Sequence, residues 1–259
     1  MMLKLKLLIV FLFLPIIVFA QNPEWKVFKS THFLVYYKQA SEYLLQELSQ
    51  KVECYYDEIT EEFGFNRINF WTWDNRAKIY LYDNQDEYKK VNRDLAWSSG
   101  AVIVRNKSIQ TYITAQGLLD NVLAHELAHI IFREMVGFGN PAVPLWLEEG
   151  VASFQERRAQ NLSVKNYLAD KIRSGNFMNL DQLRNFSTKT AENKQVINLF
   201  YVESYSLVNY LISEFGKDKF VLFCQYLRDK KDLTRAFRFA YSFDSLEDLE
   251  SAWKVSILK

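Results

Sequence analysis

The sequence has few cysteines and no excess of basic residues, so it is typical neither of a cysteine-rich nor of a nucleic-acid-binding protein. Among 259 residues there are two cysteines, Cys54 and Cys224, and three histidines. Two cysteines cannot form the disulfide framework of a small secreted domain, although an exported protein could join this pair. The chain also has almost no net charge, because 32 basic residues face 31 acidic ones. The basic residues are interleaved with acids, so we expect no nucleic-acid partner.

Long apolar runs are scarce as well, and only the amino terminus has one. Lys4 and Lys6 precede an uncharged apolar run over residues 7–20, which ends in a small residue, Ala20. This pattern predicts a signal peptide over residues 1–20 and therefore an exported protein, periplasmic or extracellular. The run is shorter than the roughly 20 residues that span a bilayer comfortably, so an uncleaved membrane anchor is the alternative. After removal of the leader we expect no stable membrane span.

Residues 21–259 are numerous enough for one domain with a substantial core, and their apolar periodicity predicts an α+β fold. We expect a small mixed sheet before about residue 140 and a mainly helical part from about residue 141. Predicted strands cover residues 25–37, 77–82, 100–105 and 109–114, and predicted helices cover 41–62, 118–135, 164–173, 193–215, 217–228, 233–241 and 245–258. The segment 175–193, rich in Asn, Ser and Thr, is predicted to be a connection, either an ordinary surface loop or a lid.

Two of the three histidines belong to one helical segment, His125-Glu126-Leu127-Ala128-His129. Side chains four positions apart lie above one another on a helix, so both imidazoles can bind the same metal ion. Glu126 projects about 100° around the helix from His125, where its carboxylate can reach a water molecule at the metal without being a ligand. The segment predicts a zinc site with His125 and His129 as ligands and Glu126 as general base. The third histidine, His32, is predicted to make a local hydrogen bond.

A catalytic zinc ion usually has three protein ligands and keeps its fourth position for water or substrate, so this segment is one ligand short. Segment 144–154 supplies a candidate, because it is predicted to be a helix that begins near a proline. On this helix Glu149 shares a face with Gly150 and Ser153, small residues that would permit close approach to the histidine helix. Glu148 points to another side. Glu149 is therefore the predicted third ligand, and Glu148 is the reserve choice.

Together these segments resemble the gluzincin metallopeptidases, and most closely the bacterial peptidase MA-like domains. The resemblance rests on the HExxH segment and on Trp146-Leu147-Glu148-Glu149-Gly150-Val151-Ala152, whose second glutamate follows His129 by twenty positions. In that pattern the glutamate just before the glycine is the third zinc ligand, which corresponds to Glu149. The resemblance implies a zincin-like α+β fold over nearly the whole of residues 21–259, a bound Zn2+ ion, and peptide or protein substrates.

Residues 201–211 are similar to the gluzincin segment in which a tyrosine begins a helix after the zinc site. In that family the tyrosine donates a hydrogen bond to the oxyanion of the tetrahedral intermediate, and the matching position here is Tyr201. This chain has Ser204 where many relatives have glycine. Tyr205, one helical turn after Tyr201, is the alternative candidate.

The expected reaction is hydrolysis of a peptide bond by a water molecule that zinc activates and Glu126 deprotonates. An extended substrate would pair with the edge of the sheet, formed by either strand 100–105 or strand 109–114. Two other functions fit the same residues. One is a zinc hydrolase that acts on a non-peptide amide, and the other is an inactive binding or scaffold protein that keeps the fold.

Overall fold

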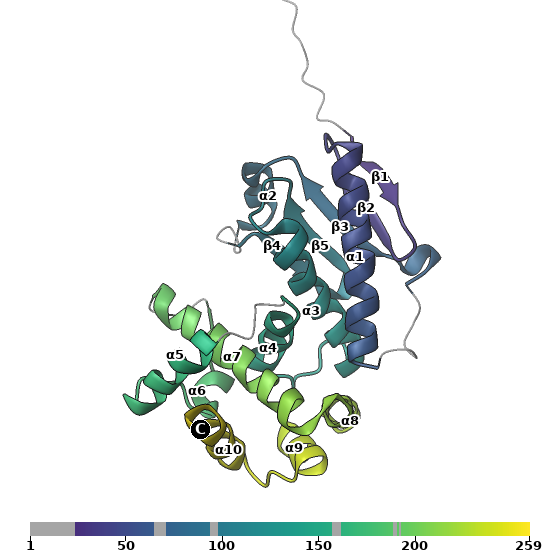
Figure 1. The fold of residues 1–259 in the computed structure, drawn as a ribbon. Coiled ribbons are helices and arrows are strands. Elements are labelled where there is room, and N and C mark those ends of the chain that lie inside the picture. Colours follow the sequence, from purple (N-terminus) through teal and green to yellow (C-terminus); the bar gives the residue numbers. More distant parts are fainter. Residues whose placement is uncertain (1–23, 65–70, 94–97, 157–161, 189–190, 192) are drawn as a thin grey trace, which may run out of the picture.

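The computed structural model describes residues 24–64, 71–93, 98–156, 162–188, 191 and 193–259, so the predicted signal peptide lies outside the described residues. The fold is α+β, with a five-stranded sheet in the first half of the chain and helices in the second half. Figure 1 shows the sheet with helix α3 (Leu123–Val136) packed across it and the C-terminal helices beyond α3. The predicted zincin-like α+β layout is confirmed.

The sheet is mixed, with the strand order β1-β2-β3-β5-β4. Its three central strands are parallel, whereas β1 and β4 are antiparallel edge strands. The chain passes from β2 to its parallel neighbour β3 through helix α1 (Glu42–Glu62), as parallel pairing requires a long crossover. The strands are β1 (Lys26–Lys29), β2 (Phe33–Tyr37), β3 (Ala77–Tyr82), β4 (Gly100–Ile103) and β5 (Ser108–Tyr112).

Strand β3 has the predicted bounds, whereas β5 begins one residue and ends two residues before the predicted strand, and the other two predicted strands are shorter than expected. The predicted strand 25–37 is in fact two strands, because a tight turn between them closes with a 3.0 Å hydrogen bond from the Ser30 N–H to the Phe33 carbonyl. The predicted strand 100–105 ends at Ile103. A single 3-10 turn follows, and Lys107 then takes a left-handed conformation with φ 48° that leads into β5.

One face of the sheet is covered by α1 and α3, which also contact each other. Val35, Ile79 and Ile109 are paired across neighbouring strands and fully buried, so they form one apolar row beneath these helices. The start of α1 is fixed by Ser41, whose hydroxyl accepts a hydrogen bond from the Leu44 N–H at 3.2 Å. Burial of one side of α3 against the sheet leaves its other side facing the C-terminal helices.

The C-terminal half is built on the close packing of α4 (Leu145–Gln155) against α7 (Lys194–Phe215). A β-carbon at Gly150 would lie 2.4 Å from the Ser204 carbonyl oxygen and 2.7 Å from the Val208 side chain. Any larger residue at this position would therefore push the two helices apart. The prediction that Gly150 permits approach to the histidine helix is wrong, since this glycine faces α7 instead.

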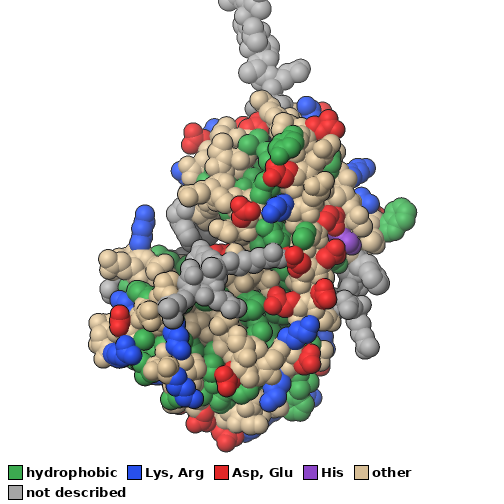
Figure 2. Space-filling view, viewed as in Figure 1, with side chains coloured by type: hydrophobic (Ala, Val, Ile, Leu, Met, Phe, Trp, Pro, Cys, Tyr) green, Lys and Arg blue, Asp and Glu red, His purple; other side chains and the backbone are tan. Residues whose placement is uncertain are grey.

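The remaining C-terminal helices are α5 (Leu162–Arg173), α8 (Lys217–Lys230), α9 (Leu233–Tyr241) and α10 (Leu246–Leu258), each close to its predicted bounds. None of the helices in the described ranges is both long and apolar enough to cross a membrane. Cys54 is exposed on α1 and Cys224 is buried on α8, and both are free thiols. On the face seen in Figure 2, basic and acidic side chains are interspersed, as the near-neutral composition predicts.

Two short helices were not predicted. Helix α2 (Gln85–Val91) begins at Asn84, whose side chain accepts a hydrogen bond from the Glu87 N–H. Helix α6 (Leu180–Arg184) lies inside the segment predicted to be a loop or a lid, and its start is fixed by a reciprocal capping box between Asn179 and Gln182. Since α6 is anchored in the core by buried leucines, the loop and lid predictions for this part of the segment are wrong.

The chain entering α6 is held by two carboxylates. Both oxygens of Glu203, on α7, accept a hydrogen bond from the Met178 N–H, at 3.1 and 3.2 Å. Glu250, on α10, accepts a hydrogen bond from the Leu180 N–H at 2.8 Å. Burial raises the pKa of Glu203 to about 8, although the Met178 N–H opposes this shift. Glu203 is fully buried, so the folded state binds its proton more tightly than the unfolded state does.

We predict that Glu203→Gln removes a pH-dependent loss of stability. The pKa of Glu203 is higher in the folded chain than in the unfolded chain, where it is about 4.3. Its protonated form therefore contributes stability below about pH 4.3, and this contribution is lost as the pH rises to about 8. The variant should match the native chain near pH 4.5 and be more stable at pH 8, as measured by urea unfolding. Glu214→Gln, at an exposed position on the same helix, is the control and should not change the slope.

Candidate metal and catalytic site

The histidine helix begins with an irregular turn. Residues Leu118–Val122 form one π-helical turn, and Gly117 precedes it with φ 72°. The Gly117 carbonyl accepts hydrogen bonds from the N–H groups of Asn121 and Val122, at 2.8 and 3.0 Å. From Leu123 the helix is regular, so His125 and His129 are stacked one turn apart as the sequence predicts. Turns of this kind often occur at functional sites.

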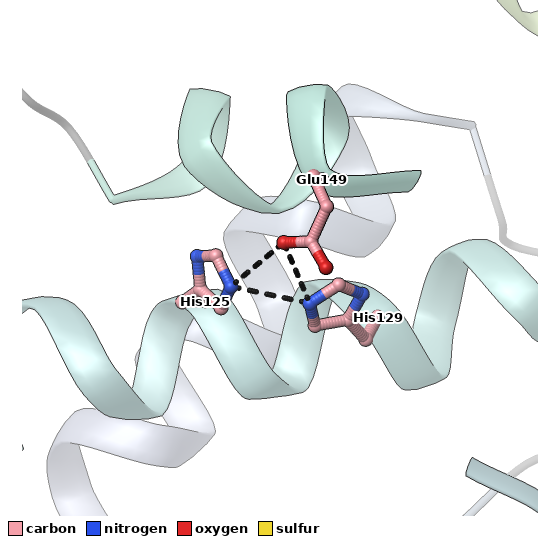
Figure 3. A group of neighbouring side chains, drawn as sticks. All are labelled: His125, His129 and Glu149. Carbon is pink, nitrogen blue, oxygen red and sulfur yellow. Dashed lines mark hydrogen bonds and ion pairs between the residues drawn. The ribbon is translucent and has the colours of Figure 1, made fainter. Parts of the chain in front are cut away.

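Helix α4 brings Glu149 to the two histidines (Figure 3). The Nε2 atoms of His125 and His129 are 3.1 Å apart, and the Oε2 atom of Glu149 is 3.5 Å from the first and 3.7 Å from the second. Ligands that bind a tetrahedral zinc ion at 2.0–2.1 Å are separated by about 3.3 Å. The three donor atoms therefore already have the mutual spacing of a zinc coordination sphere.

The environment of these donors also fits a cation. Glu149 Oε2 is buried and accepts no hydrogen bond within the described part of the chain. Only 17% of the His125 side chain and 8% of the His129 side chain are exposed. Three electron-rich atoms that meet in a buried space repel one another unless a positive charge lies between them. The donor set, two imidazoles and one carboxylate, is one of the sets that catalytic zinc sites use.

The outward nitrogens of both imidazoles face carboxylates as well. His125 Nδ1 is 2.6 Å from Glu156 Oε1, and His129 Nδ1 is 3.5 Å from Glu148 Oε1. The other oxygen of Glu148 accepts a short hydrogen bond from Arg133. Glu148, the reserve ligand, thus contacts the outer side of His129 and not the space between the histidines. Sequence reasoning missed Glu156, although its position seven residues after Glu149 places it on nearly the same face of α4.

The charges of this cluster shift its pKa values strongly. Burial lowers the pKa of His125, but Glu149 and Glu156 outweigh burial and raise it to about 10. Burial raises the pKa of Glu148, but His129 and Arg133 outweigh that effect and lower it to about 2. For Glu149 the same competition between burial and the two imidazoles ends with a lowered pKa. The cluster therefore favours positive charge at the centre and negative charge around it.

Glu126, the predicted general base, lies beside the edge strand. Its side chain is buried against Gly100, the first residue of β4. A β-carbon at Gly100 would lie 2.8 Å from Glu126 Oε1 and 2.7 Å from the side chain of Val122. Burial raises the pKa of Glu126, and the two imidazoles offset only part of this rise. A carboxylate with a raised pKa accepts a proton more readily near neutral pH.

The two candidate tyrosines have different surroundings on α7. Tyr201 is half-buried and packs edge-on against Phe200, with ring centroids 5.6 Å apart. The ring of Tyr205 stacks on Phe154 at 6.5 Å and lines an open groove with Ser206. Phe154 follows Glu149 by five positions, so it points about 140° away from Glu149 around α4. Tyr205 therefore contacts the side of α4 opposite to the ligand.

The third histidine lies apart from this cluster, as predicted, but its hydrogen bond is not local. His32 Nδ1 is 2.5 Å from Glu53 Oε2, on α1, and the same carboxylate accepts the His32 backbone N–H at 2.8 Å. The imidazole stacks on Tyr56 with ring centroids 4.2 Å apart. His32 thus links the start of β2 to α1.

This fold is that of a zincin-like protein. The model of one protein family, the peptidase MA superfamily, matches residues 72–259, and the chain belongs to that superfamily. A search of curated proteins finds no match. The matched region contains β3, β4, β5 and all the helices from α2 onward, including both segments that supply the His125, His129 and Glu149 donors. Membership of this superfamily implies peptide or protein substrates.

We predict that Gly100→Ala displaces the Glu126 carboxylate. The added methyl group would overlap Glu126 and Val122, so the free energy of unfolding should fall by about 1–3 kcal/mol. Urea unfolding measures the loss, and a crystal structure of the variant measures the displacement. Val122→Ala in the Gly100→Ala background removes one of the two overlaps and should recover part of the stability. Unchanged stability and an unmoved Glu126 would contradict the close packing described here.

Proposed function

We propose that this protein is a zinc-dependent peptidase. The observation that carries the proposal is the convergence of His125 Nε2, His129 Nε2 and Glu149 Oε2 at separations of 3.1–3.7 Å. These three side chains would hold the metal, and the superfamily match supports peptide bonds as the substrate. When bound, zinc supplies a Lewis acid that polarises the substrate carbonyl and lowers the pKa of water toward about 7.

Glu126 would act as the general base. It accepts the proton of the attacking water and later donates it to the departing amine, so one carboxylate serves both steps. Burial raises the pKa of Glu126, which makes its carboxylate a better proton acceptor. Packing against Gly100 restricts the orientations of the carboxylate, which reduces the entropy that must be lost when the substrate binds.

The substrate would bind along β4 as an added strand. In the described part of the chain β4 is the sheet edge on the side of α3, which supports β4 over β5 as the strand that pairs with the substrate. Gly100 lies at the start of β4 and contacts Glu126. An extended peptide paired with this strand would therefore pass close to the proposed base.

Tyr201 is the residue that we propose to donate a hydrogen bond to the oxyanion. It lies on α7, the helix that Gly150 allows to pack directly on the ligand helix α4. The alternative, Tyr205, stacks on Phe154 and thus on the side of α4 that faces away from Glu149. This difference in direction favours Tyr201.

We also propose that the protein is exported and that residues 21–259 form the mature catalytic domain. The support comes from the sequence alone, in the basic residues and the apolar run of the first twenty positions. Mass spectrometry of the protein secreted by its host should find Gln21 as the first residue. A mature chain that still begins at Met1 would favour the membrane anchor instead.

Glu126→Gln tests the mechanism. The variant should fold and retain zinc, because Glu126 is not a ligand, but peptide hydrolysis should fall by about 10²–10⁴-fold through loss of the base. The measurement is a peptide-library digest with and without a chelator, together with metal analysis of the purified protein. Asp120→Asn, at an exposed side chain just before α3, is the control and should keep full activity. Zinc binding without hydrolysis in the native chain would indicate the inactive scaffold, and hydrolysis of non-peptide amides alone would indicate the other alternative.

Glu149→Gln and Glu148→Gln together test the ligand assignment. Glu149→Gln removes a charged donor from the centre of the site and should weaken zinc binding severely. Glu148→Gln changes the outer side of His129 and the ion pair with Arg133, and substitutions at such outer positions typically cost 10–100-fold in affinity. Competition with a chromogenic chelator measures both affinities. If Glu148→Gln had the larger effect, the assignment of Glu149 as the third ligand would be wrong.

A further inference from the structure

Glu156 is a buried carboxylate at an unfavourable place in the fold. It is the C-cap residue that follows α4, and its N–H donates to the Ala152 carbonyl at 3.3 Å. Only 7% of the residue is exposed. The carboxyl end of a helix carries partial negative charge, so a buried carboxylate there is disfavoured by the helix itself. Its presence therefore requires a compensating partner.

That partner is His125. The Glu156 Oε1 atom is 2.6 Å from His125 Nδ1, a short charge-assisted contact. A carboxylate can only accept at this distance, so Nδ1 must carry the hydrogen. In a neutral imidazole the other nitrogen, Nε2, then has a free lone pair. This nitrogen is the one that faces His129 and Glu149.

The second histidine is held less tightly. His129 Nδ1 is 3.5 Å from Glu148, and that carboxylate also binds Arg133. Part of the negative charge of Glu148 is thus neutralised by a guanidinium. Of the two outer carboxylates, Glu156 is the closer to its imidazole by nearly an ångström.

We propose that Glu156 is a positioning residue that fixes the orientation and the tautomer of His125 for metal binding. This inference rests on the proposed zinc site and deepens it. Helix α4 and its C-cap residue then supply both the carboxylate ligand and the carboxylate that orients the first imidazole, about two turns apart. Any displacement of α4 relative to α3 would disturb both contacts together.

The small number of histidines makes a direct test practical, because only three imidazoles contribute to a ¹H–¹⁵N spectrum of the rings. In the zinc-loaded native protein, His125 should show a protonated, downfield-shifted Nδ1 and a metal-bound Nε2. Glu156→Ala should lose the protected Nδ1–H signal and bind zinc about 10–100-fold more weakly. Glu156→Gln keeps an acceptor oxygen without the charge, so it should retain the signal and lie between the two in affinity.

Glu53→Ala is the matched control, since Glu53 contacts His32 Nδ1 at 2.5 Å in the same way but outside the site. It should change the His32 signals and leave zinc affinity unaltered. Circular dichroism checks folding, and if Glu156→Ala does not fold, Glu156→Gln decides the question through its affinity. Native affinity in the Glu156 variants, with the His125 signals unmoved, would overturn the inference and leave the proposed zinc site standing. A native chain that binds no zinc would overturn both.

Discussion

The packing of α4 against α3 is the constraint on which the site depends. It holds two imidazole nitrogens and one carboxylate oxygen within 3.7 Å of one another, in a space where water can stabilise few of their charges. Around this centre, four acids that are buried or mostly buried outnumber the one arginine that contacts them among the described residues. The groups involved are Glu126, Glu148, Glu149, Glu156 and Arg133. Such a cluster is stable when a cation neutralises it, and costly otherwise.

Several distant parts of the chain contribute to that packing. Below α3, the apolar row of the sheet fixes the position and rotation of the histidine helix. On the other side of α4, the absence of a side chain at Gly150 allows α7 to pack closely against α4, which lies between α7 and α3. Arg133 and Glu148 join the two helices directly. The strands β1 and β2 and helix α1 precede the region matched by the family model, yet they complete the sheet and cover α3, so the folded domain must include them.

The sequence was sufficient for features that depend on local periodicity. The spacing of His125 and His129, the face of Glu149 and the bounds of β3 all follow from repeats of 3.6 or 2 residues. The sequence did not predict features that depend on contacts between residues far apart in the chain. The role of Glu156 becomes visible only when the fold places it beside His125. The sequence shows that Gly150 is small, but it does not show that α7 packs against it. Helix α6 was missed because its five residues are stabilised by a capping box and two buried leucines rather than by a long apolar repeat.

The position of the proposed base Glu126 depends on the register with which the edge strand β4 pairs in the sheet. Gly100 pairs with Thr111 on β5, and this register places a residue without a side chain against Glu126. A shift of one position would turn Ala101 toward α3, and its methyl group would occupy the space that the Glu126 carboxylate uses. The same hydrogen bonds that fix this register also fix the backbone to which an added peptide strand would pair. Sheet pairing, base orientation and substrate alignment are therefore set by one short strand, and a change in its register would alter all three.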